Sequence, residues 1–172
     1  FVYCLRSFPS EDSFSLAIEL VLTGNFEVAH EAFEILDNVK EKIDQETKLV
    51  LIQRSTGYTL RRAFTIKEIE KAIKIIRDIN PNVIIFVDNC YGEFTEKLEP
   101  SQVGADIIAG SLIKNLGGGI AITGGYICSN KDLIEYCSNY LTAPGIGKDE
   151  GLSFGQNRLF MEGLYFAPHV VK

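Results

Sequence analysis

The sequence feature that most constrains the fold is a pair of short apolar runs separated by an amphipathic stretch. The runs are KLVLIQ (Lys48–Gln53) and VIIFV (Val83–Val87), both of strand length. Between them Thr65 and Glu68 match the S/T-x-x-E pattern that caps a helix, isoleucines recur at helical spacing, and Asn80-Pro81 ends the helix. Strand, helix and strand of these lengths predict a right-handed crossover between parallel strands.

Two further apolar runs extend the predicted sheet. ADIIAG (Ala105–Gly110) is a third strand, and GIAITGGYICS (Gly119–Ser129) contains a fourth, whose glycine pair suggests a bulge. Ser129 and Asp132 form a second capping pair, ahead of a helix with the sequence LIEYCSNYL. We therefore predict an α/β fold in which a mostly parallel sheet is flanked by helices.

The first part of the chain gives weaker signals. FSLAIELVLTGN (Phe14–Asn25) and FEVAHEAFEILDNVKEKI (Phe26–Ile43) are interpreted as two surface helices. Residues 1–37 therefore form a helical segment without further assignment. Phe1 opens the chain without a methionine, which suggests a fragment of a longer protein.

Charge and cysteine usage argue against several classes of protein. A formal net charge of −6 disfavours nucleic acid as a partner, because that binding depends on Lys and Arg neutralising phosphates. No apolar run reaches the roughly 18 residues that a membrane span needs. The four cysteines lie far apart and match no metal-ligand pattern, so we expect reduced thiols, no metal site and a cytoplasmic protein.

Polar residues that directly follow the strands are the first candidates for a site, because ligands bind beyond the carboxyl ends of strands in open α/β sheets. Asp88 follows the second run, and Lys114 lies in GSLIKNLGGG (Gly110–Gly119) after the third. A carboxylate at the tip of a buried strand needs a cationic partner. Two interpretations stay open: a structural ion pair between Asp88 and Lys114, or a protonated ligand nitrogen held between them.

The glycine run does not match a nucleotide-binding loop. A Walker loop has its lysine after the glycines and before Ser or Thr, whereas Lys114 precedes the glycines here. The fingerprint G-x-G-x-x-G fails because Ile122 stands where the third glycine belongs. Ser111 and Lys114 also match the S-x-x-K pattern of serine acyl-transfer enzymes, so a Ser-Lys hydrolase is an alternative function.

Three segments together resemble the cofactor-binding core of fold-type-I pyridoxal-phosphate enzymes. They are VDNCYGEF (Val87–Phe94), GADIIAGSLIKN (Gly104–Asn115) and GGGIAITGGYI (Gly117–Ile127). The nearest match is the methionine gamma-lyase-like group also called aluminium resistance proteins, which are relatives of cystathionine beta- and gamma-lyases. The resemblance implies that residues 38–172 are part of the large, pyridoxal-phosphate-binding domain of a fold-type-I transferase, whereas residues 1–37 do not match the family.

The resemblance also implies residue roles. Lys114 would form the Schiff base with the aldehyde of pyridoxal 5'-phosphate, Asp88 would keep the pyridine nitrogen protonated, and Ser111 would hydrogen-bond the phosphate. Because Lys114 must be neutral to attack an aldehyde, we expect a site that lowers its pKa. The glycines Gly117 to Gly119 would let the backbone pass close to the cofactor. Cys90, two residues after Asp88, is interpreted as a packing residue.

The implied activity is that of a carbon-sulfur lyase. The complete protein would cleave a sulfur amino acid of the cystathionine or methionine type by beta or gamma elimination, as a homodimer or homotetramer. Arg54 and Arg158 lie nearest to the matched motifs, but neither is assigned to the substrate carboxylate. A second alternative is a truncated product or binding module whose cofactor site is vestigial and catalytically silent.

Overall fold

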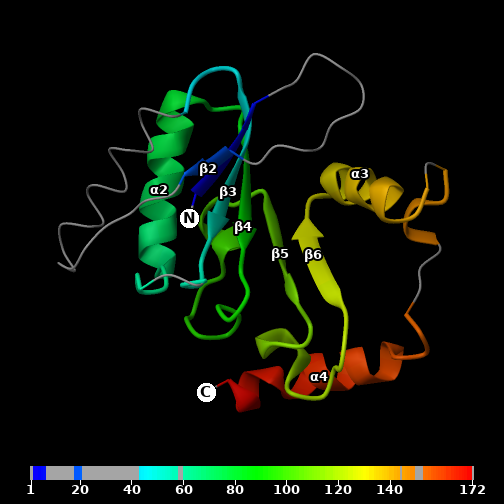
Figure 1. Ribbon diagram of the computed structural model, residues 1–172. Coiled ribbons are helices and arrows are strands. Elements are labelled where there is room, and N and C mark those ends of the chain that lie inside the picture. The colour runs from blue at the N-terminus through cyan, green and yellow to red at the C-terminus, as the bar shows by residue number, and fades with distance from the viewer. Residues whose placement is uncertain are drawn as a thin grey trace.

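Within the described residues, the strands form one mixed sheet of six (Figure 1). The structure is a computed structural model that describes residues 2–6, 18–20, 43–57, 60–143, 145–149 and 153–171. In the order β2-β1-β3-β4-β5-β6, the sheet contains β1 (Val2–Arg6), β2 (Ile18–Leu20), β3 (Thr47–Gln53), β4 (Ile84–Asp88), β5 (Ile107–Ser111) and β6 (Gly125–Ser129). The helices are α2 (Ile66–Ile79), α3 (Lys131–Leu141) and α4 (Asn157–Val170).

The predicted crossover is confirmed as β3-α2-β4. Strands β3 and β4 are parallel, with Leu49 opposite Ile84 and Gln53 opposite Asp88. One face of α2 packs on these strands, because its isoleucines recur at helical spacing. The resulting core contains Ile43, Val50, Ile52, Ile66, Ile69, Ile73, Ile76, Val83, Ile85 and Val87. Since Ile85 and Val87 point into this core, strand alternation places Asp88 on the other face of the sheet.

The α/β class is confirmed, and parallel pairing occupies the middle of the sheet. Strand β5 is parallel to β4, whereas β6 is antiparallel to β5 and β1 is antiparallel to β3. The chain turns straight back between β5 and β6 without a crossover helix, and such a return requires antiparallel pairing. The fourth predicted strand therefore closes a hairpin whose turn contains Lys114 and the glycine run.

The helix predicted over residues 14–25 is wrong where the structure describes it. Residues Ile18–Leu20 form β2, which pairs antiparallel with β1. A short apolar run fits a strand as well as a helix, and the neighbouring strand supplies hydrogen bonds that the sequence pattern does not reveal. The rest of that prediction, and the helix predicted over residues 26–43 apart from Ile43, lie outside the described residues.

One of the two predicted helix caps is confirmed. Thr65 caps α2 in a capping box, in which its side chain accepts from the Glu68 amide and the Glu68 side chain accepts from the Thr65 amide. The second cap was misassigned by one residue, because Asn130 caps α3 by accepting from the Leu133 amide at 2.9 Å. Ser129 still belongs to β6 and donates its hydroxyl to the Asp106 carbonyl.

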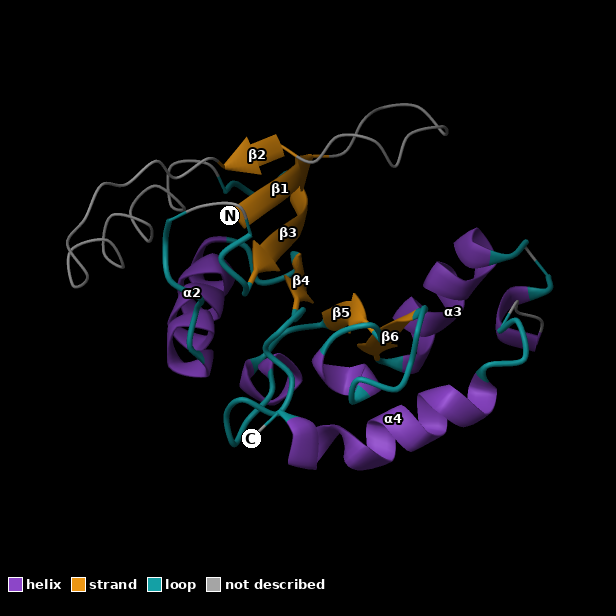
Figure 2. Ribbon diagram, turned by 60° about the horizontal axis from the view of Figure 1, so that its bottom comes forward, coloured by secondary structure: helices purple, strands orange, loops and turns teal. Residues whose placement is uncertain are grey.

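The helices lie on different parts of the sheet (Figures 1 and 2). Helix α2 lies beside β3 and β4, whereas α3 and α4 lie near β5 and β6. Helix α4 also packs against the 3₁₀ turn Asn115–Gly117, directly after Lys114. Among the described helices, none has the length and apolar character needed to cross a membrane.

Candidate active site

Asp88 ends β4 at the carboxyl edge of the sheet. Its Oδ1 accepts a hydrogen bond from the Cys90 amide at 3.0 Å, which turns the chain immediately after the strand. Ala109 of β5 lies opposite Asp88 in the ladder, so Ser111, two residues further on, extends past the same edge. The two strand ends therefore bring Asp88 and the loop with Lys114 to one place, as the strand-end argument predicted.

Lys114 lies three residues beyond the end of β5, where its amide donates to the Ser111 carbonyl at 3.3 Å. Its Nζ lies 4.6 Å from the centroid of the Tyr91 ring, and Cys90 and Asp88 lie near enough to influence its charge. The Asp88 carboxylate lies close enough to the Cys90 sulfur to help raise the pKa of that thiol. Asp88 and Lys114 thus meet around one thiol, and no ion pair joins them directly in the part of the chain that the structure describes.

The electrostatics of this cluster differ from the expectation. Burial lowers the pKa of Lys114, but its interactions with Cys90, Tyr91 and the Asp88 carboxylate outweigh burial, so the pKa lies above its ordinary value. The expected lowering was wrong for this arrangement because the groups around the amine are acidic rather than cationic. Burial, followed by the hydrogen bond to Asp88, raises the pKa of the Cys90 thiol.

Cys90 and Tyr91 are site residues whose contacts the sequence did not reveal. Cys90 was interpreted as packing, yet its sulfur contacts both Asp88 and Lys114. Tyr91 has φ of 66° and carries its ring over the loop after β5. Their positions directly after the strand-end aspartate were the available signal, since the first residues beyond such a strand line the site.

Ser111 is half-buried at the end of β5. Its Oγ accepts from the Ile113 amide at 3.3 Å. A hydroxyl that accepts one bond keeps its proton for another acceptor, such as a phosphate oxygen. Ser111 therefore fits the role of a phosphate ligand.

The first two glycines after Lys114 are required by the protein's own backbone. A Cβ on Gly117 would lie 1.5 Å from the Leu112 carbonyl oxygen, and one on Gly118 would lie 2.5 Å from the carbonyl oxygen of Gly163 in α4. Gly119, with φ of +70°, has open space where a Cβ would be. Close packing of the turn against itself and against α4 thus explains Gly117 and Gly118 without a cofactor.

We expect Gly117→Ala to destabilise the protein by at least about 3 kcal/mol, since the added methyl overlaps backbone that cannot move aside independently. The matched control is Gly119→Ala, because a Cβ at Gly119 would have no atom within 4 Å. This substitution should destabilise the protein only through the left-handed backbone conformation, by about 1 kcal/mol. Urea unfolding followed by circular dichroism measures both. Equal costs for the two substitutions would contradict the packing assigned to the turn.

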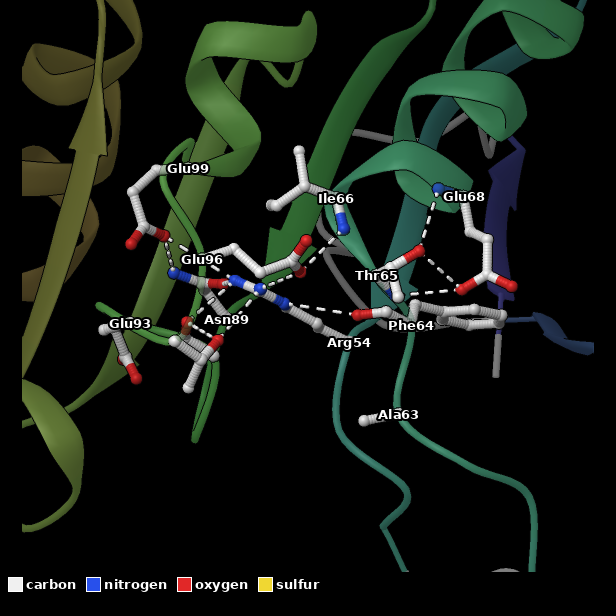
Figure 3. Close-up of polar contacts among 12 residues, drawn as sticks. Arg54, Ala63, Phe64, Thr65, Ile66, Glu68, Asn89, Glu93, Glu96 and Glu99 are labelled. Atoms are coloured by element: carbon white, nitrogen blue, oxygen red, sulfur yellow. Dashed lines mark hydrogen bonds and ion pairs between the residues drawn. The ribbon is translucent and has the colours of Figure 1, made fainter. Parts of the chain in front are cut away.

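Arg54 binds the loop after β4 through several polar contacts (Figure 3). The side chain is only 3% exposed, and its Nη1 donates to Asn89 Oδ1 at 2.8 Å and to the Gly92 carbonyl at 2.9 Å. Its Nη2 donates to the Glu96 carboxylate at 2.8 Å, and Nη1 lies 3.7 Å from Glu99. With these contacts Arg54 is a structural residue rather than a free ligand for a substrate carboxylate.

Arg158 does not reach the site residues either. Its side chain is 87% exposed on α4 and pairs with Glu162 one turn later, at 2.7 Å. Neither of the two arginines considered from the sequence therefore has a free guanidinium at the carboxyl edge beside Asp88. Among the described residues, no group of three or more His, Cys, Asp or Glu side chains is placed to hold a metal ion.

A cavity of about 580 Å³ adjoins the cluster. It lies between the loop after β3 and the loop after β4, and its walls include Phe64, Cys90 and Tyr91. Cys90 and Tyr91 are also the residues that contact Lys114, so the cavity and the lysine share one wall. The space is large enough for a small organic ligand.

Glu93 joins the two loops of the site. Its backbone carbonyl accepts from Asn115 Nδ2 at 3.1 Å, and its Oε1 accepts from the Tyr126 hydroxyl at 2.8 Å. The residue is 3% exposed, and Oε2 has no hydrogen-bond partner among the residues described. Burial raises the pKa of Glu93 above its ordinary value.

The raised pKa of Glu93 predicts a pH-dependent stability. The folded state binds the proton more tightly than the unfolded state, so this stabilisation is complete below the ordinary value of 4.5 and is lost as pH rises through the raised pKa. We expect Glu93→Gln, which keeps the acceptor for Tyr126, to remove this loss. Free energies of unfolding from urea titrations between about pH 4 and 8 test it, with exposed Glu135→Gln as the control. Parallel pH curves for wild type and Glu93→Gln would show the assignment to be wrong.

Comparison with known proteins adds the family. The methionine gamma-lyase family model matches residues 20–172, a range that includes residues 20–37, which the resemblance had left out. YnbB of Bacillus subtilis, an uncharacterised protein, is 52% identical over 135 residues, which are 78% of this chain and 32% of that protein. This chain thus spans about a third of the length of such relatives.

Solved structures agree with this match. A crystal structure from Listeria innocua, named as a candidate cystathionine beta-lyase involved in aluminium resistance, is 52% identical with a TM-score of 0.76, covering 78% of this chain and 33% of that one. Cystathionine gamma-lyase from Lactobacillus plantarum shares the fold at 22% identity and a TM-score of 0.56, over 77% of this chain and 32% of its own. The β3-α2-β4 crossover and the strand ends with Asp88 and Lys114 lie within the matched range, and this chain belongs to the methionine gamma-lyase family.

Proposed function

We propose that this chain is part of a pyridoxal-phosphate-dependent carbon-sulfur lyase that acts on a sulfur amino acid by beta or gamma elimination. One observation carries the proposal: Asp88 and Lys114 come from two neighbouring strand ends to one place beside Cys90 and Tyr91, and within the described residues no ion pair joins them. A structural ion pair would have brought the two charges into contact. A carboxylate and an amine that lie apart at the carboxyl edge of the sheet are suited to a ligand that interacts with both.

The described residues fit pyridoxal 5'-phosphate. Lys114 offers the amine that would hold the aldehyde, Asp88 offers a carboxylate for the ring nitrogen, and Ser111 offers a hydroxyl proton for the phosphate. The bound cofactor supplies an electron sink for negative charge that develops on the substrate Cα. Asp88 would keep the ring nitrogen protonated, because a nearby carboxylate favours the cationic form.

Lys114 would then act as the proton carrier. Its amine would take the proton from the substrate Cα and would deliver a proton to the departing sulfur. Cys90 and Tyr91 hold that amine beside Asp88 in the arrangement observed here. The acidic surroundings favour the ammonium form, which suits proton delivery to the leaving group.

A Ser-Lys hydrolase is less well supported. In that chemistry the lysine must take the proton from the serine hydroxyl, so their side chains must hydrogen-bond. Here the Ser111 Oγ accepts from the Ile113 amide, while Lys114 Nζ is directed to Cys90 and Tyr91. Within the described residues, no hydrogen bond joins the Ser111 and Lys114 side chains, which disfavours Ser111 as an activated nucleophile.

The complete protein is proposed to act in the cytoplasm as a homodimer or homotetramer on a free amino acid. Because this chain spans about a third of its relatives, the remainder of the protein would supply the group that binds the substrate carboxylate. The alternative, a catalytically silent truncated product or binding module with a vestigial site, keeps the fold without the chemistry.

The test uses the full-length protein. After incubation with pyridoxal 5'-phosphate and cystathionine, cysteine or methionine, we expect release of a 2-oxo acid and ammonia together with a sulfur product. The product identifies the bond that breaks: a four-carbon oxo acid and a thiol from methionine indicate gamma elimination, and pyruvate from cystathionine or cysteine indicates beta elimination. Full-length protein that binds the cofactor but releases none of these products would favour the silent alternative.

A further inference from the structure

We propose that Tyr91 is a positioning residue for Lys114, whose ring face holds the lysine amine beside Asp88 whenever that amine is not covalently bonded. This inference rests on the proposed function, because it gives Tyr91 a part in the same site. Neither the strand-end argument nor the S-x-x-K pattern assigns a role to this tyrosine. Its case depends on three observations: the contact with Lys114, the exposure of the ring and the backbone conformation.

The contact has the geometry of a cation–π interaction. Lys114 Nζ lies 4.6 Å from the centroid of the Tyr91 ring, within the roughly 6 Å over which a ring face attracts an ammonium group. The other groups that face Nζ are the Cys90 sulfur and the Asp88 carboxylate. The Tyr91 ring therefore lies on one side of the amine, and the Cys90 thiol and the Asp88 carboxylate lie near it on the others.

Core packing does not account for Tyr91. The residue is 60% exposed, so most of its ring is not buried against other side chains. A tyrosine retained only for hydrophobic burial would be expected inside, as Ile85 and Val87 are in the strand before it. The ring contact with Lys114 is thus the specific interaction that the structure gives this side chain.

The backbone at Tyr91 is strained, so the presence of an aromatic residue at this position calls for an explanation. Its φ of 66° lies in the left-handed region, where a bulky residue is costly and glycine is not. Such conformations persist when the surroundings fix them, and they cluster at functional sites. An aromatic side chain at a position that favours glycine indicates that the ring itself is needed.

The surroundings that fix this conformation are visible in Figure 3. Arg54 binds the loop on both sides of Tyr91, through Asn89 Oδ1 and the Gly92 carbonyl. Gly92 is buried directly against the guanidinium, where a Cβ would lie 2.5 Å from Arg54 Nη1. The buried Arg54 thus stabilises the loop conformation in which the Tyr91 ring contacts Lys114.

Loss of the ring should change the reactivity of the amine in two ways. Without the Tyr91 ring the Lys114 amine samples more orientations, so the rate at which it captures pyridoxal 5'-phosphate at high pH should fall by about tenfold. The ring also favours the ammonium form, so without it the apparent pKa of capture should fall by about half a unit. A merely structural tyrosine would move neither quantity in this pattern.

The experiment measures cofactor capture by full-length protein across pH. Pyridoxal 5'-phosphate is added, the covalent bond is fixed by borohydride at timed intervals, and the labelled Lys114 peptide is quantified by mass spectrometry. We expect the capture rate of Tyr91→Phe to stay within about twofold of wild type, because phenylalanine keeps the ring face. Tyr91→Leu should show both the lower capture rate at high pH and the lower apparent pKa of capture. Tyr165→Leu, a change at an exposed tyrosine of α4, is the matched control.

A second variant separates folding from positioning. Tyr91→Gly relieves the backbone strain, so its melting temperature should rise above that of wild type while its capture falls as in Tyr91→Leu. Equal capture rates and pH profiles for wild type and Tyr91→Leu would overturn the inference while leaving the proposed function intact, and so would a Phe variant that behaves like Leu. Wild-type protein without label on Lys114 would overturn the proposed function and this inference with it.

Discussion

Replacement of Lys114 by alanine is expected to lower the turnover of sulfur amino acids by the full-length protein by at least about 10³-fold. The physical reason is that one amine both holds the cofactor and carries the protons, and no other described lysine contacts the Asp88–Cys90 cluster. Release of 2-oxo acid, followed continuously with a coupled dehydrogenase, measures the effect. Binding of the cofactor should become noncovalent.

The matched control is Lys74→Ala. Lys74 lies on α2 with its side chain 70% exposed and pairs with Glu70 one turn before it. Removal of this surface pair should cost no more than about 0.5 kcal/mol and leave turnover within about twofold of wild type. Substantial turnover by Lys114→Ala, with the control unchanged, would assign the chemistry to another residue.

The second large effect is expected at Arg54. Arg54→Met keeps much of the aliphatic stem but removes the guanidinium, leaving Asn89, Glu99 and the Gly92 carbonyl without their buried donor. The buried Asn89 and Gly92 acceptors would lose their donor at a cost of about 1–3 kcal/mol each, whereas the Glu99 side chain is 30% exposed and stays hydrated. We therefore expect a loss of this size in the free energy of unfolding, measured by urea denaturation.

Arg158→Met provides the comparison for Arg54. Arg158 also pairs with a glutamate, but its side chain is 87% exposed, so the same substitution should cost less than about 0.5 kcal/mol. Because Arg54 fixes the loop with Cys90 and Tyr91, Arg54→Met should also slow cofactor capture by any protein that remains folded. A cost at Arg54 no larger than at Arg158 would show that the network does not stabilise this loop.

The parts of the fold that follow from local patterns were predictable from the sequence. Thr65 and Glu68 marked the start of α2, and the apolar runs marked β3 and β4, because capping and burial act over a few residues. The rule that ligands bind beyond parallel strand ends was enough to place Asp88 near Lys114. Strand β2 was missed, because its conformation depends on pairing with β1.

The detailed site was less predictable, since it depends on contacts across the fold. Arg54 follows β3, yet its partners from Asn89 to Glu99 lie 35 to 45 residues later in the chain, and no local pattern reports such a network. Tyr91 reaches Lys114 through a left-handed backbone that its residue type disfavours. The acidic surroundings of Lys114 likewise depend on the fold, so the expected direction of its pKa shift was wrong.

The central claim is that Asp88 and Lys114 face one ligand from neighbouring strand ends. A crystal structure of the full-length protein grown with pyridoxal 5'-phosphate tests it most directly. We predict continuous density from Lys114 Nζ to the cofactor, with the Asp88 carboxylate within about 3 Å of the ring nitrogen. Density that joins the cofactor to another residue, or an Asp88–Lys114 ion pair that leaves no space for a ring, would contradict the account.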